Sequence, residues 1–325
     1  MYLSKTPLRV SFLGGGTDLP AFYEKHDYGC VISIAINRYV YVGVNSRFDN
    51  KIRLAYSRNE LIDDVGLIEN DRIKATLSKV NIASGIELFC FSDIPEKMGL
   101  GGSSAFTVGL LNALYRYKSV RKFPESLARE ACEIEIDMLR NPIGKQDQYA
   151  AAFGGLNYIR FNADGTVQIV RVLIAEEKII SLLNNLLFIY LGQPHDSAAI
   201  LHDVGMNIEN HKNDRHLIRV RDLTDAFHDD LANGNIDNFA PYLREYWEIK
   251  KKTSSKISNI VYDDLYSVAM NNGACAGKIL GAGGGGFFMF YVPEEAQQSF
   301  CKKFSSYRIC KFDIDHVGTQ IAHQD

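Results

Sequence analysis

Short apolar runs rich in β-branched and aromatic residues alternate along the chain with longer segments whose apolar residues recur at helical spacing. The first pattern predicts strands and the second predicts amphipathic helices. The predicted strands cover residues 8–13, 31–36, 39–44, 87–91, 156–161, 167–172, 186–191 and 287–292. The predicted helices cover residues 106–117, 124–139, 220–233, 239–253 and 264–272. Strands and helices mixed in this way predict an α/β (α+β) fold.

Polar segments between these runs predict how the elements connect. Asn37-Arg38 separates two strand-like runs, which predicts a β-hairpin. The charge-rich stretch 203–222 is predicted to be a solvated surface segment, with a helix and a mobile connection that acts as a lid as the alternative. The first set of strands and helices closes between residues 165 and 185, so we expect an N-terminal domain of residues 1–175 and a C-terminal domain of residues 176–325.

The composition is that of a globular protein and excludes several classes of function. Hydrophobic residues make up 46% of the 325 positions, and the net charge is −3, which argues against nucleic acid or an anionic membrane as a partner. We find no apolar run long enough to span a membrane and no apolar leader at the N-terminus. The six cysteines are scattered, which favours free thiols in a reducing cytoplasm. The eight histidines lack metal-ligand spacing, so a catalytic zinc is not expected.

The segment Pro95–Ala105 is the strongest signal for chemistry. Gly99, Gly101 and Gly102 allow the backbone to approach a ligand closely, and the helix that follows offers unpaired N–H groups that suit a phosphate. Ser103 or Ser104 is predicted to cap that helix, and a serine hydroxyl beside a phosphate can help to hold Mg²⁺. The alternative is an ordinary loop with a serine cap. The segment is not a P-loop, because no lysine precedes Ser103.

A second glycine-rich loop, Gly281–Gly286, matches the dinucleotide-binding pattern only formally. We expect a helix before it and a strand after it, the reverse of what a dinucleotide site requires. The loop is therefore predicted to wrap a phosphate or a neighbouring loop, with a tight β-turn as the alternative.

Several charged residues are candidates for a polar site. Arg9 lies in an apolar strand and needs a carboxylate or a phosphate as partner. Asp147 is predicted to lie on a loop, as a general base or as a capping or turn residue. Asp18 is predicted either to accept sugar hydroxyls or to cap a helix that begins near Pro20. Among the acidic residues at 130–137, one that turns inward would suit Mg²⁺.

Taken in order, these segments resemble the GHMP kinase family of galactokinase, homoserine kinase, mevalonate kinase and phosphomevalonate kinase. The family's motifs are similar to residues 7–18, 95–105, 144–155 and 278–287, and the resemblance covers nearly the whole chain. Gly-Gly-Gly-Thr-Asp at residues 14–18, where other members have Gly-Glu-His-Thr-Asp, resembles the branch of D-glycero-D-manno-heptose 7-phosphate kinases and fucokinases. The resemblance implies an N-terminal domain like ribosomal protein S5 domain 2 and a ferredoxin-like C-terminal domain, with ATP between them.

The resemblance also implies roles for individual residues. Asp147 would be the catalytic base, and Arg9 would stabilise charge on the transferred phosphoryl group. The ATP phosphates would contact Gly99, Leu100, Gly101, Gly102, Ser103 and Ser104. Mg²⁺ would be held by Ser104 and Glu135. The sugar would contact Gly15, Gly16, Thr17, Asp18, Gly283 and Gly284.

The implied reaction is ATP-dependent phosphorylation of the anomeric hydroxyl of heptose 7-phosphate to the 1,7-bisphosphate, for nucleotide-activated heptose and surface lipopolysaccharide. This branch usually carries Thr-Gly-x-x-Arg where this chain has Leu191-Gly192-Gln193-Pro194-His195. His195 and Lys278 are therefore the candidates to hold a distal phosphate. The alternatives are a kinase of an unphosphorylated sugar such as fucose and a catalytically silent sugar or nucleotide sensor. The expected partner is a small-molecule sugar or sugar phosphate, and a homodimer is a candidate assembly.

Overall fold

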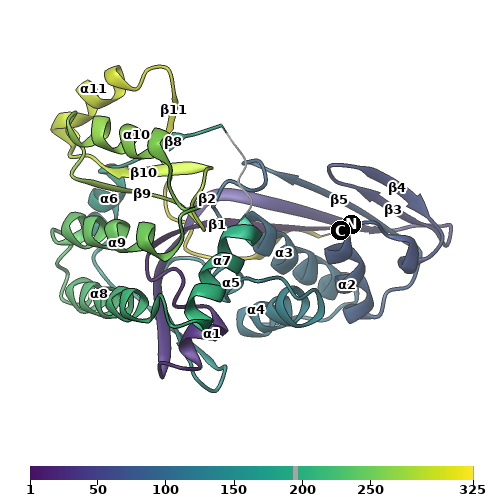
Figure 1. Ribbon diagram of the computed structural model, residues 1–325. Coiled ribbons are helices and arrows are strands. Elements are labelled where there is room, and N and C mark those ends of the chain that lie inside the picture. The colour runs from purple at the N-terminus through teal and green to yellow at the C-terminus, as the bar shows by residue number, and fades with distance from the viewer. Residues whose placement is uncertain (193–196, 325) are drawn as a thin grey trace.

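The computed structural model describes residues 1–192 and 197–324, and its strands form two sheets (Figure 1). The larger sheet contains β1 (Tyr2–Leu13), β2 (Tyr28–Ser46), β3 (Ile52–Ala55), β4 (Asn59–Ile62), β5 (Ile86–Ser92), β6 (Leu156–Asn162), β7 (Val167–Arg171) and β12 (Gln320–Gln324). The smaller sheet contains β8 (Leu186–Tyr190), β9 (Ala276–Ile279), β10 (Phe287–Tyr291) and β11 (Arg308–Cys310). The helices are α1 (Pro20–Tyr23), α2 (Asp71–Val80), α3 (Gly102–Tyr117), α4 (Pro124–Cys132), α5 (Gln146–Phe153), α6 (Glu176–Asn184), α7 (Ser197–Glu209), α8 (Asp214–Ala232), α9 (Phe239–Thr253), α10 (Ile260–Met270) and α11 (Glu294–Lys303), with a 3₁₀ turn at Val65–Leu67 and a π-helical segment at Glu133–Met138.

The larger sheet packs one face against helices α2 to α5 (Figure 1). Along β2 the buried residues Val40, Val42 and Val44 alternate with the partly exposed Tyr39 and Tyr41. This alternation places every second side chain in the core beneath the helices. The apolar pattern therefore positions β1, α3 and α5 against one another, and these elements carry the site described below.

The predicted hairpin at residues 31–44 is wrong, because both predicted strands belong to the single strand β2. β1 pairs with β2 along nearly its whole length, and the register shifts where Pro7 and Leu8 lie opposite Tyr39 and Ile36. Asn37 and Arg38 are therefore the extra residues of a bulge rather than a turn. The Asn37 amide donates to the carbonyl of Asp313 (2.9 Å), a partner 276 residues away that the local pattern does not reveal.

The smaller sheet has the strand order β11-β8-β10-β9, and every neighbouring pair is antiparallel. Helices lie between β8 and β9 in the chain and again between β10 and β11. This β-α-β-β-α-β order is that of a ferredoxin-like fold. The predicted α/β class and the predicted C-terminal topology are therefore both confirmed.

The last strand crosses back to the first sheet, because β12 pairs with β1. The N- and C-terminal ends of the chain consequently lie side by side (Figure 1). The chain passes from the larger to the smaller sheet between β7 and β8. We propose domains of residues 1–175 and 176–325, with β12 as a strand that the second domain returns to the first.

The charge-rich stretch 203–222 is largely helical, since it covers the second half of α7 and the first half of α8. The helix predicted at 220–233 therefore begins earlier, at Asp214. The predicted helix at 124–139 continues beyond α4 as the π-helical segment. Among the described residues, no helix combines the length and the apolar character that a membrane span requires.

Candidate active site

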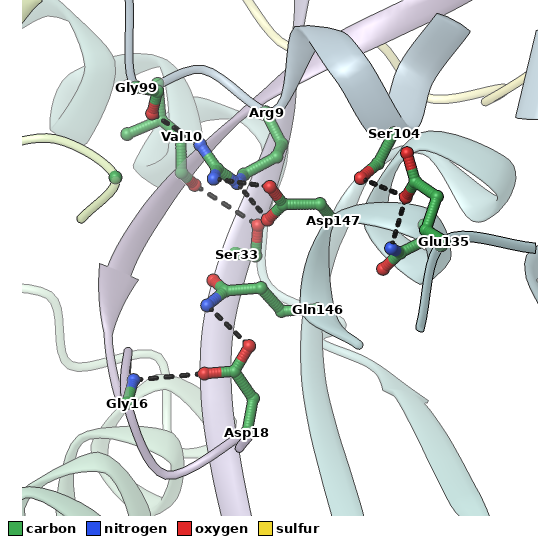
Figure 2. Close-up of polar contacts among 12 residues, drawn as sticks. Arg9, Val10, Gly16, Asp18, Ser33, Gly99, Ser104, Glu135, Gln146 and Asp147 are labelled. Atoms are coloured by element: carbon green, nitrogen blue, oxygen red, sulfur yellow. Dashed lines mark hydrogen bonds and ion pairs between the residues drawn. The ribbon is translucent and has the colours of Figure 1, made fainter. Parts of the chain in front are cut away.

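An ion pair between the buried Arg9 and the partly exposed Asp147 joins β1 to α5. The Arg9 guanidinium donates Nε to Asp147 Oδ1 (2.7 Å) and its second terminal nitrogen to Asp147 Oδ2 (2.8 Å), while the remaining nitrogen donates to the Gly99 carbonyl (2.6 Å) (Figure 2). The predicted need of Arg9 for a carboxylate partner is confirmed. The predicted loop position of Asp147 is wrong, because Asp147 lies in the first turn of α5. The N-cap of that helix is Lys145, so Asp147 does not cap it either. The two-point contact fixes the Asp147 carboxylate, whose side chain is 23% exposed, with a cation at its side.

A second carboxylate, that of Asp18, lies near Asp147, with Gln146 between the two (Figure 2). Asp18 accepts from the Gly16 amide (3.0 Å) and from Gln146 Nε2 (2.9 Å). Burial raises the pKa of Asp18, and the nearby negative charge of Asp147 also raises it. The predicted cap is wrong, because Leu19 is the N-cap of α1 and Asp18 faces Gln146 instead. Asp18 is thus a buried acceptor of hydrogen bonds close to Asp147.

The glycine loop ends at α3. Gly99 and Gly101 have positive φ angles of 78° and 73°, and Gly101 rather than a serine is the N-cap of α3. The predicted serine cap is wrong because both serines already lie inside the first helical turn. Ser103 is exposed there, whereas Ser104 is buried. The first N–H groups of this helix point out of its end, where they suit a phosphate group.

Glu135 is fully buried beneath the start of α3 and carries four hydrogen bonds. Its carboxylate accepts from Arg72 Nε (2.8 Å), Thr107 Oγ1 (2.9 Å), Ser104 Oγ (2.7 Å) and Gln148 Nε2 (2.6 Å). Glu135 lies in the π-helical segment, a rare local geometry that is frequent at functional sites. The prediction that one acidic residue of 130–137 turns inward is confirmed, although Glu130 is buried as well.

The donors around Glu135 fit a hard cation in part. A hydroxyl and a carboxylate oxygen 2.7 Å apart are ligands that Mg²⁺ accepts together with phosphate oxygens and water. The Arg72 guanidinium is the cation that balances Glu135 here. Among the described residues, no group of three or more His, Cys, Asp or Glu side chains is arranged to hold a metal alone. A magnesium ion at this place would therefore depend on the phosphates of a nucleotide.

The second glycine-rich loop touches the first. A Cβ on Gly281 would lie 2.7 Å from the Gly99 Cα, and one on Gly286 would lie 2.4 Å from the Met98 carbonyl oxygen. The loop joins β9 to β10, so the helix expected before it is wrong and a strand lies on each side. Gly283 and Gly284 pack against the Ile257 segment, and the Gly284 amide donates to the Ile257 carbonyl (2.9 Å). The loop thus supports the backbone of the first glycine loop.

The remaining residues that were predicted to bind substrate differ in their positions. Thr17 is buried, and its hydroxyl lies 2.8 Å from both the Gly14 and the Cys30 carbonyl oxygens, either of which can accept its single proton. The Gly15 carbonyl faces the Tyr246 hydroxyl (3.4 Å). Lys278, expected beside the substrate, lies instead in the interior with 1% exposure and donates to the Phe12 carbonyl (2.9 Å). His195 lies outside the described residues.

The sequence pattern did not identify four residues of this network, namely Arg72, Thr107, Gln146 and Gln148. Gln146 and Gln148 flank Asp147 and so lay within a motif already singled out. Arg72 gave no local signal, because it lies 63 positions from Glu135 in a charged helix.

Comparison with known proteins gives matches over both halves of the chain. The family model for the GHMP kinases N terminal domain matches residues 67–155, and the model for the GHMP kinases C terminal matches residues 227–307. Together these matches cover more than half of the chain.

Individual relatives and solved structures are similar over nearly the full length. A D-glycero-alpha-D-manno-heptose 7-phosphate kinase of Campylobacter jejuni is 29% identical over 323 residues, covering 92% of this chain and 91% of the relative. A bifunctional fucokinase/GDP-fucose pyrophosphorylase of Arabidopsis thaliana is 23% identical over 89% of this chain, which corresponds to 29% of that protein. The crystal structure of a D-glycero-D-manno-heptose 1-phosphate kinase from Bacteroides thetaiotaomicron superposes with a TM-score of 0.82 at 24% identity, covering all of both chains.

Proposed function

The chain belongs to the GHMP kinase family, and from this premise we propose that it is a sugar kinase that phosphorylates the anomeric hydroxyl of D-glycero-D-manno-heptose 7-phosphate. The product is the 1,7-bisphosphate, and ATP is the phosphoryl donor. The observation that carries the proposal is the Asp147 carboxylate, which Arg9 holds beside the glycine loop that leads into α3. The heptose 7-phosphate kinase of Campylobacter jejuni, similar over 92% of this chain, supports this substrate class.

In this proposal Asp147 and Arg9 act on the two sides of the transferred group. The Asp147 carboxylate accepts the proton of the acceptor hydroxyl or orients that hydroxyl for attack. Arg9 is held at Asp147 and at the Gly99 carbonyl, so its positive charge lies where negative charge develops on the phosphoryl group. Phosphoryl transfer depends mainly on such positioning and charge stabilisation.

We assign the nucleotide side to the loop from Gly99 to Ser104 and the start of α3. The backbone N–H groups there bind the phosphates of ATP. Ser104 and Glu135 are the residues that would hold Mg²⁺, which neutralises phosphate charge when it is bound. Free cysteines and a requirement for ATP agree with a cytoplasmic enzyme.

A kinase of an unphosphorylated sugar is the second candidate. The match to a plant fucokinase extends over 89% of this chain, and Gln193-Pro194-His195 stands where the heptose 7-phosphate branch has an arginine. Without that arginine, recognition of a distal phosphate would depend on other groups.

An assay of ADP release with Mg-ATP and a panel of acceptors tests the proposal. The panel contains heptose 7-phosphate, mannose, fucose, galactose, N-acetylhexosamines and mevalonate. We expect turnover with heptose 7-phosphate at a rate well above that of every free sugar. Preference for a free sugar would contradict the heptose-phosphate assignment, and silence on every acceptor with intact ATP binding would favour a sensor.

A further inference from the structure

Three consecutive side chains in the first turn of α5 each take part in a different contact that involves a carboxylate. Gln146 donates to Asp18 (2.9 Å), Asp147 pairs with Arg9 (2.7 Å), and Gln148 donates to Glu135 (2.6 Å) (Figure 2). The proposed mechanism uses Asp147 but gives no role to either glutamine. Gln146 lies on the side of Asp18, away from the glycine loop and from Glu135 (Figure 2).

The hydrogen bond to Asp18 fixes which end of the Gln146 amide remains available. The Gln146 NH₂ group donates to the Asp18 carboxylate, so the carbonyl oxygen of the same amide points away from Asp18. That carbonyl oxygen, Oε1, is buried and has no hydrogen-bond partner among the described residues. A buried carbonyl without a partner costs free energy unless a bound donor compensates it.

A second unpaired group lies on the neighbouring strands. Ser11 is 4% exposed, and its hydroxyl has no partner among the described residues. Ser11 lies two positions after Arg9 and directly opposite Ser33 in the pairing of β1 with β2, so all these side chains share one face of the sheet. The Ser33 hydroxyl is already engaged with the Val10 carbonyl, and Ser33 lies between Asp147 and Gln146 in Figure 2. Two buried polar atoms without a partner among the described residues, Gln146 Oε1 and Ser11 Oγ, therefore lie near the pair formed by Arg9 and Asp147.

We propose that Gln146 is a specificity-determining residue that accepts a hydrogen bond from an acceptor hydroxyl other than the one that is phosphorylated. This inference rests on the proposed sugar-kinase function and identifies the part of the acceptor that this side of the site recognises. The Gln146 carbonyl and the Asp18 carboxylate both accept hydrogen bonds, and hydroxyls are neutral donors. A phosphate here would lie beside the carboxylates of Asp18 and Asp147 and would be repelled. The sugar-hydroxyl end of the acceptor thus lies here, and any phosphate that it carries lies elsewhere.

The test combines two variants of Gln146 with acceptors that each lack one hydroxyl. Gln146→Ala removes the amide, whereas Gln146→Met removes both hydrogen bonds but keeps most of the volume. We expect both variants to raise the acceptor KM at least about tenfold, the effect of losing one to two hydrogen bonds, with the KM for ATP unchanged. In the wild type one deoxy analogue should be a much poorer acceptor than the parent sugar, and in both variants this particular penalty should largely disappear.

Gln297→Ala is the matched control, because it makes the same chemical change at a glutamine whose amide donates, among the described residues, to the Asn184 and Val292 carbonyls. It should leave both KM values and the pattern of analogues unchanged. Thermal melting of every variant reports whether the fold is retained. A fall in kcat with unchanged acceptor KM and unchanged analogue penalties would overturn the inference, since Gln146 would then only position Asp147.

Calorimetric titration with the same sugars separates this inference from the proposed function. If the wild type binds a sugar without phosphorylating it and the Gln146 variants bind it less tightly, the contact between Gln146 and a sugar hydroxyl stands and the kinase proposal fails. If the wild type binds none of the sugars, both are overturned. If it phosphorylates a sugar that the Gln146 variants bind equally well, only the inference is overturned.

Discussion

The arginine of the first strand is the residue on which the site depends. Arg9 is buried, and its guanidinium contacts both oxygens of Asp147 and the Gly99 carbonyl. A planar guanidinium can make these contacts together, whereas an ammonium group concentrates its charge at one point. Arg9 therefore links the carboxylate of α5 to the glycine loop, and its charge is placed between them.

Arg9→Lys should keep the positive charge but lose the two-point contact with Asp147. We expect kcat to fall about 10² to 10³-fold with little change in ATP affinity, because the fixed contact to Asp147 is lost. Arg47→Lys is a matched control, since Arg47 makes the same two-point contact with Asp49 at the surface. Steady-state kinetics of both variants check this prediction, and wild-type kcat in Arg9→Lys would contradict it.

The sequence predicts that a buried charged residue needs a partner, but it does not identify a partner that lies far away along the chain. An arginine among apolar strand residues predicts a carboxylate partner, and the acidic segment at 130–137 predicts one inward residue, here Glu135. The burial of Lys278 was not predictable, because the strand that carries it gives no sign that the Phe12 carbonyl receives its ammonium group. Residue type reveals the requirement for a partner, whereas the fold decides which partner satisfies it.

At the scale of elements, two glycine-rich loops support each other by backbone contact. The loop between β9 and β10 lies against Met98 and Gly99, so close that a Cβ at Gly286 would overlap the Met98 carbonyl. The positive φ of 81° at Gly286 adds a second reason for glycine. The second loop thus sets the position of the first.

Gly286→Ala should disturb the nucleotide side of the site. The methyl group would force Met98 and Gly99 to move, so we expect a raised KM for ATP and a loss of stability larger than the strain of the backbone angle alone. Gly85→Ala isolates that strain, because Gly85 has a similar φ of 70° and its Cβ would meet nothing closer than 3.9 Å. Gly85→Ala should cost about 1–2 kcal/mol without changing KM. Equal effects of both substitutions in urea denaturation and kinetics would rule out the contact as the cause.

The elements themselves were predictable wherever the pattern was local. The strands of the smaller sheet at 186–190 and 287–291 lie within the predicted ranges, whereas the bulge in β2 was predicted as a turn. A turn and a bulge both interrupt the apolar alternation with polar residues. The pairing of β1 with residues on both sides of Asn37 and Arg38 distinguishes them here, and the remote contact of Asn37 with the Asp313 segment supports the bulge.

At the scale of the whole molecule, two buried lysines tie the smaller sheet to the site. Lys278 of β9 donates to the Phe12 carbonyl of β1 (2.9 Å), and Lys250 of α9 donates to the Ile279 and Gly281 carbonyls (3.1 and 2.7 Å). Burial lowers the pKa of Lys250 to about 7, and the positive charge of Arg9 also lowers it. Burial likewise lowers the pKa of Lys278, with the charges of Lys250 and Arg9 as further causes.

These lysines should make stability depend on pH in the neutral to alkaline range. The unfolded chain keeps ordinary lysine pKa values near 10.5, so between about pH 7 and 10 it binds more protons than the folded protein, and the free energy of unfolding contributed by Lys250 rises with pH. Lys250→Met should flatten this rise, whereas Lys252→Met, at an exposed position of the same helix, should not. Urea denaturation at a series of pH values checks this, and an identical slope in Lys250→Met and the wild type would contradict it.

We propose above all that this chain transfers a phosphoryl group to a sugar hydroxyl, with Asp147 as the group that accepts the proton of that hydroxyl or orients it. The most direct test is the rate of ADP release by Asp147→Asn and by the wild type, with Mg-ATP and heptose 7-phosphate. Asparagine keeps the size of the side chain but removes its charge and basicity, so we expect turnover to fall about 10³-fold or more while ATP still binds. Turnover of Asp147→Asn at the wild-type rate would contradict the account.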